Sequence, residues 1–319
     1  YIYEYIDNLI MNIIITENLK EIYISIDGTP TMSKIVEQKK RRHMNYIIGC
    51  FKEQIYEKFK NTIDEINNIF YENKISFNRG YITSWSSYIQ EIFNNLNSPN
   101  YNIKLKEKCI NLRNISISSA YEFGEGEKKI MEHILFNKRS GSYVIFSPDS
   151  DVVLLSLIMQ NKLIKCNIEN RFNLIRHNQM ENEIENISIC KLRDNIYNFI
   201  YNKMNNYRKY NHLKSNIIDD IVGIFTFFGN DFLPKIESIN TKNGFIVLMD
   251  VYAKHLNWCR NYNIYLLFEE NDIIRINHDV FCNIINKISE NEDKLLFDKF
   301  LASEYKNYNY LSKIGRAHV

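Results

Sequence analysis

The spacing of apolar residues switches along the chain between two periods, which predicts strands alternating with helices. Runs of β-branched and aromatic residues predict strands at 21–26, 115–118, 142–146, 163–168 and 171–176. Apolar positions three or four residues apart predict helices at 1–18, 31–60, 128–136, 152–159, 191–206, 217–228, 244–258 and 279–304, and a mostly helical stretch at 61–100. This order predicts an α/β fold with a mainly parallel central sheet flanked by helices, followed by a helical C-terminal extension.

The composition is that of a globular chain, with 319 residues of which 45% are hydrophobic. A net charge of +2 says nothing about an anionic partner, so any such argument must rest on local clusters. The six cysteines include no CxxC pair, which favours reduced thiols in an intracellular protein over disulfides or a zinc site. No apolar run approaches the roughly 20 residues of a membrane span. We therefore expect no membrane partner. We expect the protein to be located in the cytoplasm rather than in the nucleus.

Both ends of the chain are unusual. Tyr1 already lies inside an apolar-periodic segment, so we expect the natural start to lie upstream. Residues 314–319 match a translated reading frame of a common sequencing adapter. We therefore leave these six residues out of the fold argument.

Acidic residues recur where predicted strands end. Asp27 ends one strand, Asp149 and Asp151 follow another, and Glu125 and Glu127 open the helix after a third. Ligands of parallel sheets bind at the carboxyl ends of the strands. Clustered carboxylates repel one another unless cations neutralise them, and oxygen ligands without His or Cys suit Mg²⁺ or Mn²⁺. A two-metal site for phosphoryl transfer fits this pattern. Singly, each acid is equally typical of a helix cap or a turn.

A basic helix face lies close to the first acid. Lys34, Gln38, Arg41 and Arg42 are spaced i, i+4, i+7 and i+8, so they share one face of the predicted helix. Three cations and an amide could bind a terminal phosphate that carries about two charges. The alternative is a solvated basic surface.

Four segments together resemble one family, the Xrn-type 5′→3′ exoribonucleases, which are related to flap endonucleases and PIN-like nucleases. The first segment is Asp27-Gly28 followed by the Lys34, Gln38, Arg41 and Arg42 spacing. The second is Gly124-Glu-Gly-Glu-Lys-Lys-Ile-Met131, where Lys128 replaces a family His. The others are Asp149-Ser-Asp151, and Asp219-Asp220 with Gly229-Asn-Asp-Phe-Leu-Pro234. One motif would be weak, whereas four in the same order are specific.

The resemblance implies an enzyme that hydrolyses RNA from a 5′-monophosphate end with two Mg²⁺ or Mn²⁺ ions. It implies that the metal-binding and catalytic acids are Asp27, Glu125, Glu127, Asp149, Asp151 and Asp231. Lys34, Gln38, Arg41 and Arg42 would bind the 5′-phosphate of single-stranded RNA, and Asp220 is a weaker candidate that buttresses the site. We expect a nuclease core at 1–234, a helical extension at 235–313 and a monomer, and we predict no particular protein partner.

Two alternatives stay open. A flap-type DNA nuclease would share the acids but lack the basic face, and an RNA-binding homologue would lack cleavage. A further metal-binding Asp of the family would precede Tyr1, which puts the activity of this stretch of chain in doubt.

Overall fold

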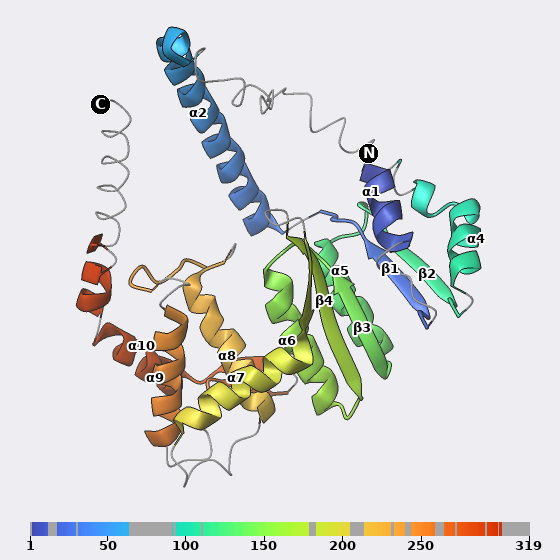
Figure 1. Ribbon diagram of the computed structural model, residues 1–319. Helices are drawn as coiled ribbons and strands as arrows, with labels where there is room; N and C mark the ends of the chain where they lie inside the picture. The colour runs from blue at the N-terminus through green and yellow to red at the C-terminus, as the bar shows by residue number, and fades with distance from the viewer. Residues whose placement is uncertain are drawn as a thin grey trace. The chain divides into compact units, whose positions relative to one another are not determined.

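The chain forms two compact units, Tyr1–His133 and Ile134–Val319, in a computed structural model (Figure 1). The structure describes residues 2–11, 18–29, 31–63, 91, 94–109, 111–178, 183–204, 214–230, 233–239, 244–258, 265–271, 273–290, 292–298 and 300–301. Each unit has its own sheet and its own apolar core.

The first unit is built on two parallel strands, β1 (Glu21–Ser25) and β2 (Asn114–Ser118), which pair in register from Glu21↔Asn114 to Ser25↔Ser118. Its helices are α1 (Ile2–Leu9), α2 (Met32–Ile63), α4 (Pro99–Lys108) and the start of α5 (Gly126–Asn137). Ser98 caps α4 by accepting a hydrogen bond from Tyr101 N, and Tyr101 and Leu105 bury the inner face of that helix. The core therefore lies under α1, α4 and the strand pair.

The second unit contains a mixed sheet of β3 (Gly141–Phe146), β4 (Asn170–Asn178) and β5 (Glu183–Ser188). Strands β3 and β4 are parallel and joined through α6 (Asp151–Lys165), whereas β5 returns antiparallel to β4. Helices α6 and α7 (Ile189–Lys203) pack against β4. Parallel strands joined by a helix are the arrangement that the alternating pattern predicted.

Helices make up most of the rest of the second unit. They are α8 (Lys214–Phe225) with the short 3₁₀ helix η3 (Thr226–Phe228), then α9 (Gly244–Trp258) and α10 (His278–Ser289). An antiparallel hairpin of β6 (Leu267–Glu270) and β7 (Ile273–Ile276) lies between α9 and α10 in the chain. Leu248, Tyr252 and Leu256 of α9 are buried against Ile221 and Ile284 in one apolar cluster. None of the helices in the described parts is both long and apolar enough to cross a membrane.

The fold class is confirmed: parallel strand pairs are flanked by helices, and a helical region follows. One predicted strand, 163–168, is wrong because α6 continues to Lys165 and the chain turns at Asn167, which has a φ of 58°. Leu163 is fully buried on that helix, and a short apolar run does not distinguish the two states. The structure also contains β5, β6 and β7, which were not predicted. Helix α10 ends at Ser289, and after a turn at Glu290 the described residues 292–298 and 300–301 are again helical, so the predicted helix at 279–304 is interrupted.

Candidate active site

Asp27 lies two residues beyond β1, in a loop bonded to the segment that precedes α5. Its Oδ1 accepts a hydrogen bond of 2.7 Å from Gly126 N. Backbone hydrogen bonds join the same two segments, since Gly28 N donates to Gly124 O at 2.9 Å and Gly124 N donates to Thr29 O at 3.1 Å. These three hydrogen bonds between the two segments hold the Asp27 carboxylate in a defined place.

Glycine is required at one point of this junction, and a second glycine there is closely packed. A Cβ at Gly28 would lie 1.7 Å from Glu122 O, which no side chain can occupy. A Cβ at Gly126 would lie 3.1 Å from Asp27 Oδ1 and 3.2 Å from Ser25 O, which is tighter than ordinary contact. The glycines of both motifs therefore allow the two loops to approach closely.

Glu125 and Glu127 stand at the start of α5, as the sequence predicted. Glu125 Oε1 is buried and accepts no hydrogen bond in the described part of the chain, and its nearest cation is Lys34 Nζ at 3.6 Å. Glu127 is half-buried in the first helical turn. A buried carboxylate oxygen without a donor is costly unless a cation compensates it. The carboxylates of this unit thus have the donor chemistry that suits a hard divalent cation.

Asp149 and Asp151 lie in the second unit, directly after β3. Asp149 N donates to Ser147 Oγ at 3.2 Å, and Asp149 Oδ1 accepts from Asp151 N at 3.4 Å at the start of α6. Both side chains are exposed. The N-cap residue of α6 is Ser150, so Asp149 lies just before the cap and makes a local turn contact with Asp151. This contact uses one carboxylate oxygen of Asp149, and a carboxylate has a second oxygen that can accept other partners.

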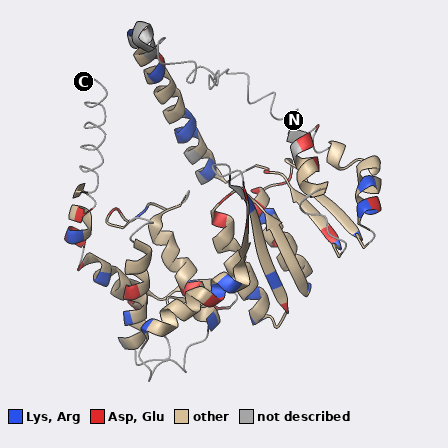
Figure 2. Ribbon diagram, in the orientation of Figure 1, with Lys and Arg blue, Asp and Glu red and all other residues tan. Residues whose placement is uncertain are grey.

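The basic face is present on one continuous helix. Lys34 and Gln38 are half-buried near the start of α2, while Arg41 and Arg42 are exposed further along it. Figure 2 shows Lys and Arg recurring along α2. The helical spacing of the four residues is confirmed, and the phosphate pocket itself stays a prediction.

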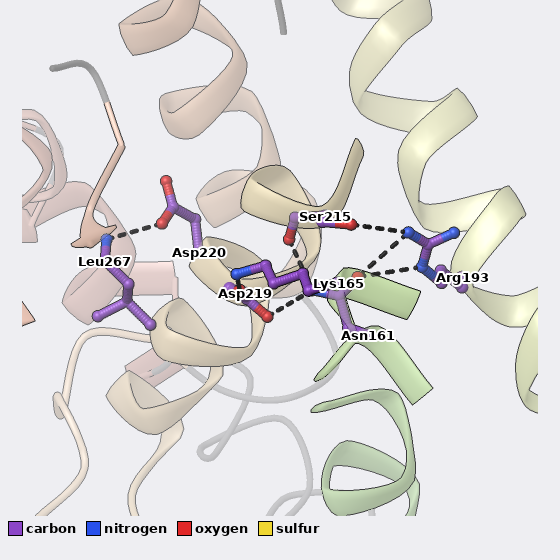
Figure 3. A network of polar contacts seen from close by, with 7 residues as sticks. All are labelled: Asn161, Lys165, Arg193, Ser215, Asp219, Asp220 and Leu267. Carbon is purple, nitrogen blue, oxygen red and sulfur yellow. Dashed lines mark hydrogen bonds and ion pairs between the residues drawn. The ribbon is translucent and has the colours of Figure 1, made fainter. Parts of the chain in front are cut away.

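The Asp219-Asp220 pair divides its two carboxylates between two structural tasks (Figure 3). Asp220 is fully buried and accepts hydrogen bonds from Tyr252 OH at 2.6 Å, Leu266 N at 2.7 Å and Leu267 N at 2.8 Å. Burial raises the pKa of Asp220 to about 7, against the lowering effect of these three donors. Asp220 thereby joins α8 to α9 and to the start of β6.

The Asp219 carboxylate contacts residues of α6. It accepts from Asn161 Nδ2 at 2.6 Å and pairs with Lys165, and Asn161 Oδ1 in turn accepts from the buried Arg193. Burial lowers the pKa of the Arg193 guanidinium, while Asp194 and Asp219 oppose that effect. This network joins α6, α7 and α8, and only the paired acids are visible as a pattern in the sequence.

The remaining predicted ligand, Asp231, lies outside the described residues. Within the described residues of each unit, no three His, Cys, Asp or Glu side chains group closely enough to hold a metal ion. Of the predicted metal ligands that the structure describes, Asp27, Glu125 and Glu127 belong to the first unit, and Asp149 and Asp151 belong to the second. Reasoning from the sequence gave no role to Lys129, which the structure places beside Asp27.

Comparison with known proteins agrees with this description. Residues 1–170 match the family model described as the XRN 5′-3′ exonuclease N-terminus, and residues 211–314 match that of the Xrn1 helical domain. The chain belongs to the Xrn family of 5′-3′ exonucleases.

Two curated relatives extend the comparison. The chain is 31% identical over 261 residues to a protein of Acanthamoeba polyphaga mimivirus named "Putative 5'-3' exonuclease"; the match covers 78% of this chain and 40% of that protein. It is 23% identical over 272 residues to 5'-3' exoribonuclease 2 of Schizosaccharomyces pombe, covering 76% of this chain and 27% of that protein. The chain thus spans less than half the length of either relative.

Proposed function

We propose that the protein is a metal-dependent 5′→3′ exoribonuclease that hydrolyses single-stranded RNA from a 5′-monophosphate end and releases nucleotides. The observation that carries the proposal is the approach of Lys34 Nζ to Glu125 Oε1 at 3.6 Å. The basic helix face and the acidic loops thereby meet within one unit of the chain. Family membership and the names of the relatives support the same activity.

In this proposal the acids Asp27, Glu125, Glu127, Asp149, Asp151 and Asp231 are the ligands of two Mg²⁺ or Mn²⁺ ions. When bound, such ions would supply Lewis acidity and neutralise the charge that develops on a phosphodiester. Gly126 N orients Asp27 through its hydrogen bond, and Asp151 N orients the Asp149 carboxylate at the start of α6. The chain's own residues thus fix the directions of two ligands before any cation arrives.

The specificity of the proposed enzyme lies in Lys34, Gln38, Arg41 and Arg42. Charged donors on one helix face can bind the oxygens of a terminal phosphate, and a guanidinium can do so in a bidentate manner. A substrate with a 5′-hydroxyl offers these donors nothing to neutralise. We therefore propose a monomeric enzyme that selects its substrate by the charge at the 5′ end.

The test uses the full-length protein with two RNAs of identical sequence, one 5′-phosphorylated and one with a 5′-hydroxyl. We expect Mg²⁺-dependent release of nucleotides from the phosphorylated RNA and much slower release from its twin. Equal degradation of both would contradict the phosphate pocket and favour a flap-type nuclease, for which branched DNA is the matching substrate. Binding of RNA without any cleavage would instead indicate a non-catalytic homologue.

A further inference from the structure

A buried lysine holds together the two loops that carry the first-unit acids. Lys129 lies in the first turns of α5 and is only 5% exposed. Its Nζ donates hydrogen bonds to Ile26 O at 2.9 Å and to Ser119 O at 2.8 Å. These carbonyls belong to the residues directly after the paired strand ends Ser25 and Ser118. A single ammonium group therefore fastens the carboxyl ends of β1 and β2 to each other.

The charge of this lysine is unusual for its surroundings. Both of its hydrogen bonds go to neutral carbonyls, and no ion pair to a carboxylate accompanies them in the described part of the first unit. Lysine is almost never fully buried unless paired, because a buried charge is costly. The first carboxylate along the loop is that of Asp27, which follows Ile26 directly in the chain. The ammonium therefore brings a buried positive charge to the carbonyl of Ile26, directly before Asp27.

The same helix also holds Asp27 from its other side. Gly126 N donates to Asp27 Oδ1, and Lys129 N donates to Glu125 O at 3.1 Å within the same turn. Asp27 is thus fixed through its carboxylate by Gly126 and through the preceding carbonyl by Lys129. Residues of the first turn of α5 therefore bond to two neighbouring residues of the loop, Ile26 and Asp27.

We propose that Lys129 is a positioning residue that sets the geometry of the loops carrying Asp27 and Glu125 for binding a divalent cation. The inference rests on the proposed function, since it assigns Lys129 to the metal ligands of that site. Groups that orient metal ligands typically change metal affinity by about 10–100-fold when they are removed. Lys129 needs no contact with RNA to have this effect.

The experiment measures Mn²⁺ binding to the full-length protein by calorimetry without RNA, and separately the affinity for 5′-phosphorylated RNA in EDTA. Lys129→Met removes the ammonium at similar length, and Lys129→Gln keeps one donor group without the charge. The matched control is Lys128→Met, because Lys128 is an exposed neighbour whose nearest acid is Glu132 at 4.0 Å. Circular dichroism confirms that each variant is folded.

We expect Lys129→Met to weaken Mn²⁺ binding by about tenfold or more and Lys129→Gln by a smaller factor. RNA affinity in EDTA should stay within about twofold for both, and Lys128→Met should change neither quantity. If Lys129→Met does not fold, the Gln variant decides alone. Unchanged Mn²⁺ affinity in a folded Lys129 variant, with a parent protein that binds Mn²⁺ and cleaves RNA, overturns this inference only. A parent protein that binds no Mn²⁺ overturns the proposed function and this inference together.

Discussion

The Asp27 carboxylate and the Gly126 amide are joined by a hydrogen bond of 2.7 Å that spans 99 positions of sequence. Such a bond lets the first turn of α5 present one acid while α5 itself carries Glu127. A charge-assisted bond to a backbone N–H is also stronger than a neutral one. The glycine that makes the bond possible is therefore a sensitive point of the site.

Gly126→Ala should reduce nuclease activity by about tenfold or more, because misplaced ligand groups are as costly as missing ones. The added Cβ would lie 3.1 Å from Asp27 Oδ1, so the loop must move. Gly49→Ala in α2 is the matched control, since a Cβ there meets nothing within 4 Å. That control should be stabilising by roughly 0.5–1 kcal/mol in thermal unfolding and should leave cleavage unchanged. Equal activity of both variants would contradict the role of the close approach.

Asp149 allows a local structural contact and metal binding to be separated. Asp149→Ala should lose the hydrogen bond that Asp149 Oδ1 accepts from Asp151 N, at no more than about 1 kcal/mol in the free energy of unfolding, and also lose Mg²⁺-dependent cleavage. Asp149→Asn keeps an oxygen that can accept this bond, but it removes the charge. We expect the Asn variant to unfold like the parent protein and yet to lose cleavage, as measured by nucleotide release. An active Asn variant would leave Asp149 with the structural contact alone.

The basic face can be tested by selectivity rather than by rate. Arg41→Ala and Arg42→Ala should each lower the preference for 5′-phosphate over 5′-hydroxyl RNA by about tenfold or more, since charged hydrogen bonds contribute roughly 1.5–3 kcal/mol. Lys40→Ala removes an exposed cation from the opposite side of α2 and is the control. The measurement is the ratio of kcat/KM for the two RNAs. A ratio that falls equally in all three variants would indicate a general charge effect and no pocket.

Asp220 predicts a dependence of stability on pH. Burial raises its folded pKa to about 7 from an ordinary value of 3.8, so the folded state binds the proton more tightly than the unfolded state does. Its contribution to stability is fully present below about pH 4 and is lost as pH rises to about 7, by at most about 4 kcal/mol at roughly 1.4 kcal/mol per pKa unit. Asp220→Asn should flatten this slope in denaturant unfolding between those limits. The variant should also be less stable at low pH, because an amide NH₂ would face a backbone donor. The same slope in the variant would show that another group titrates.

Some helices and strands could be predicted from the sequence and others could not, for physical reasons. Helix α9 coincides with the predicted 244–258 because its apolar residues follow one strong period. Strand β5 was not predicted, since its apolar residues Ile184 and Ile187 are three apart and do not alternate. Its pairing with β4 depends on contacts that lie outside the segment, and such tertiary context overrides local pattern.

In the candidate site, too, some residues could be predicted from the sequence and others could not. The acids at strand ends could be predicted because strand and helix boundaries are local features. The role of Lys129 could not, since a lysine in a helix is expected to be exposed and only the three-dimensional packing buries this one. Asp220, expected only as a weaker candidate that buttresses the site, bonds to Tyr252 and to the backbone at the start of β6.

The contact between Lys34 and Glu125 implies a thermodynamic linkage. One lysine is shared between the predicted phosphate-binding face and a carboxylate whose Oε1 receives no hydrogen bond from the residues that the structure describes. A cation that neutralises Glu125 would release Lys34 toward a phosphate, and a phosphate that engages Lys34 would leave Glu125 in need of a cation. Because such coupling is reciprocal, each ligand would raise the affinity for the other by the same factor. Substrate and metal would then load the enzyme cooperatively, so that neither binds strongly while the other is scarce.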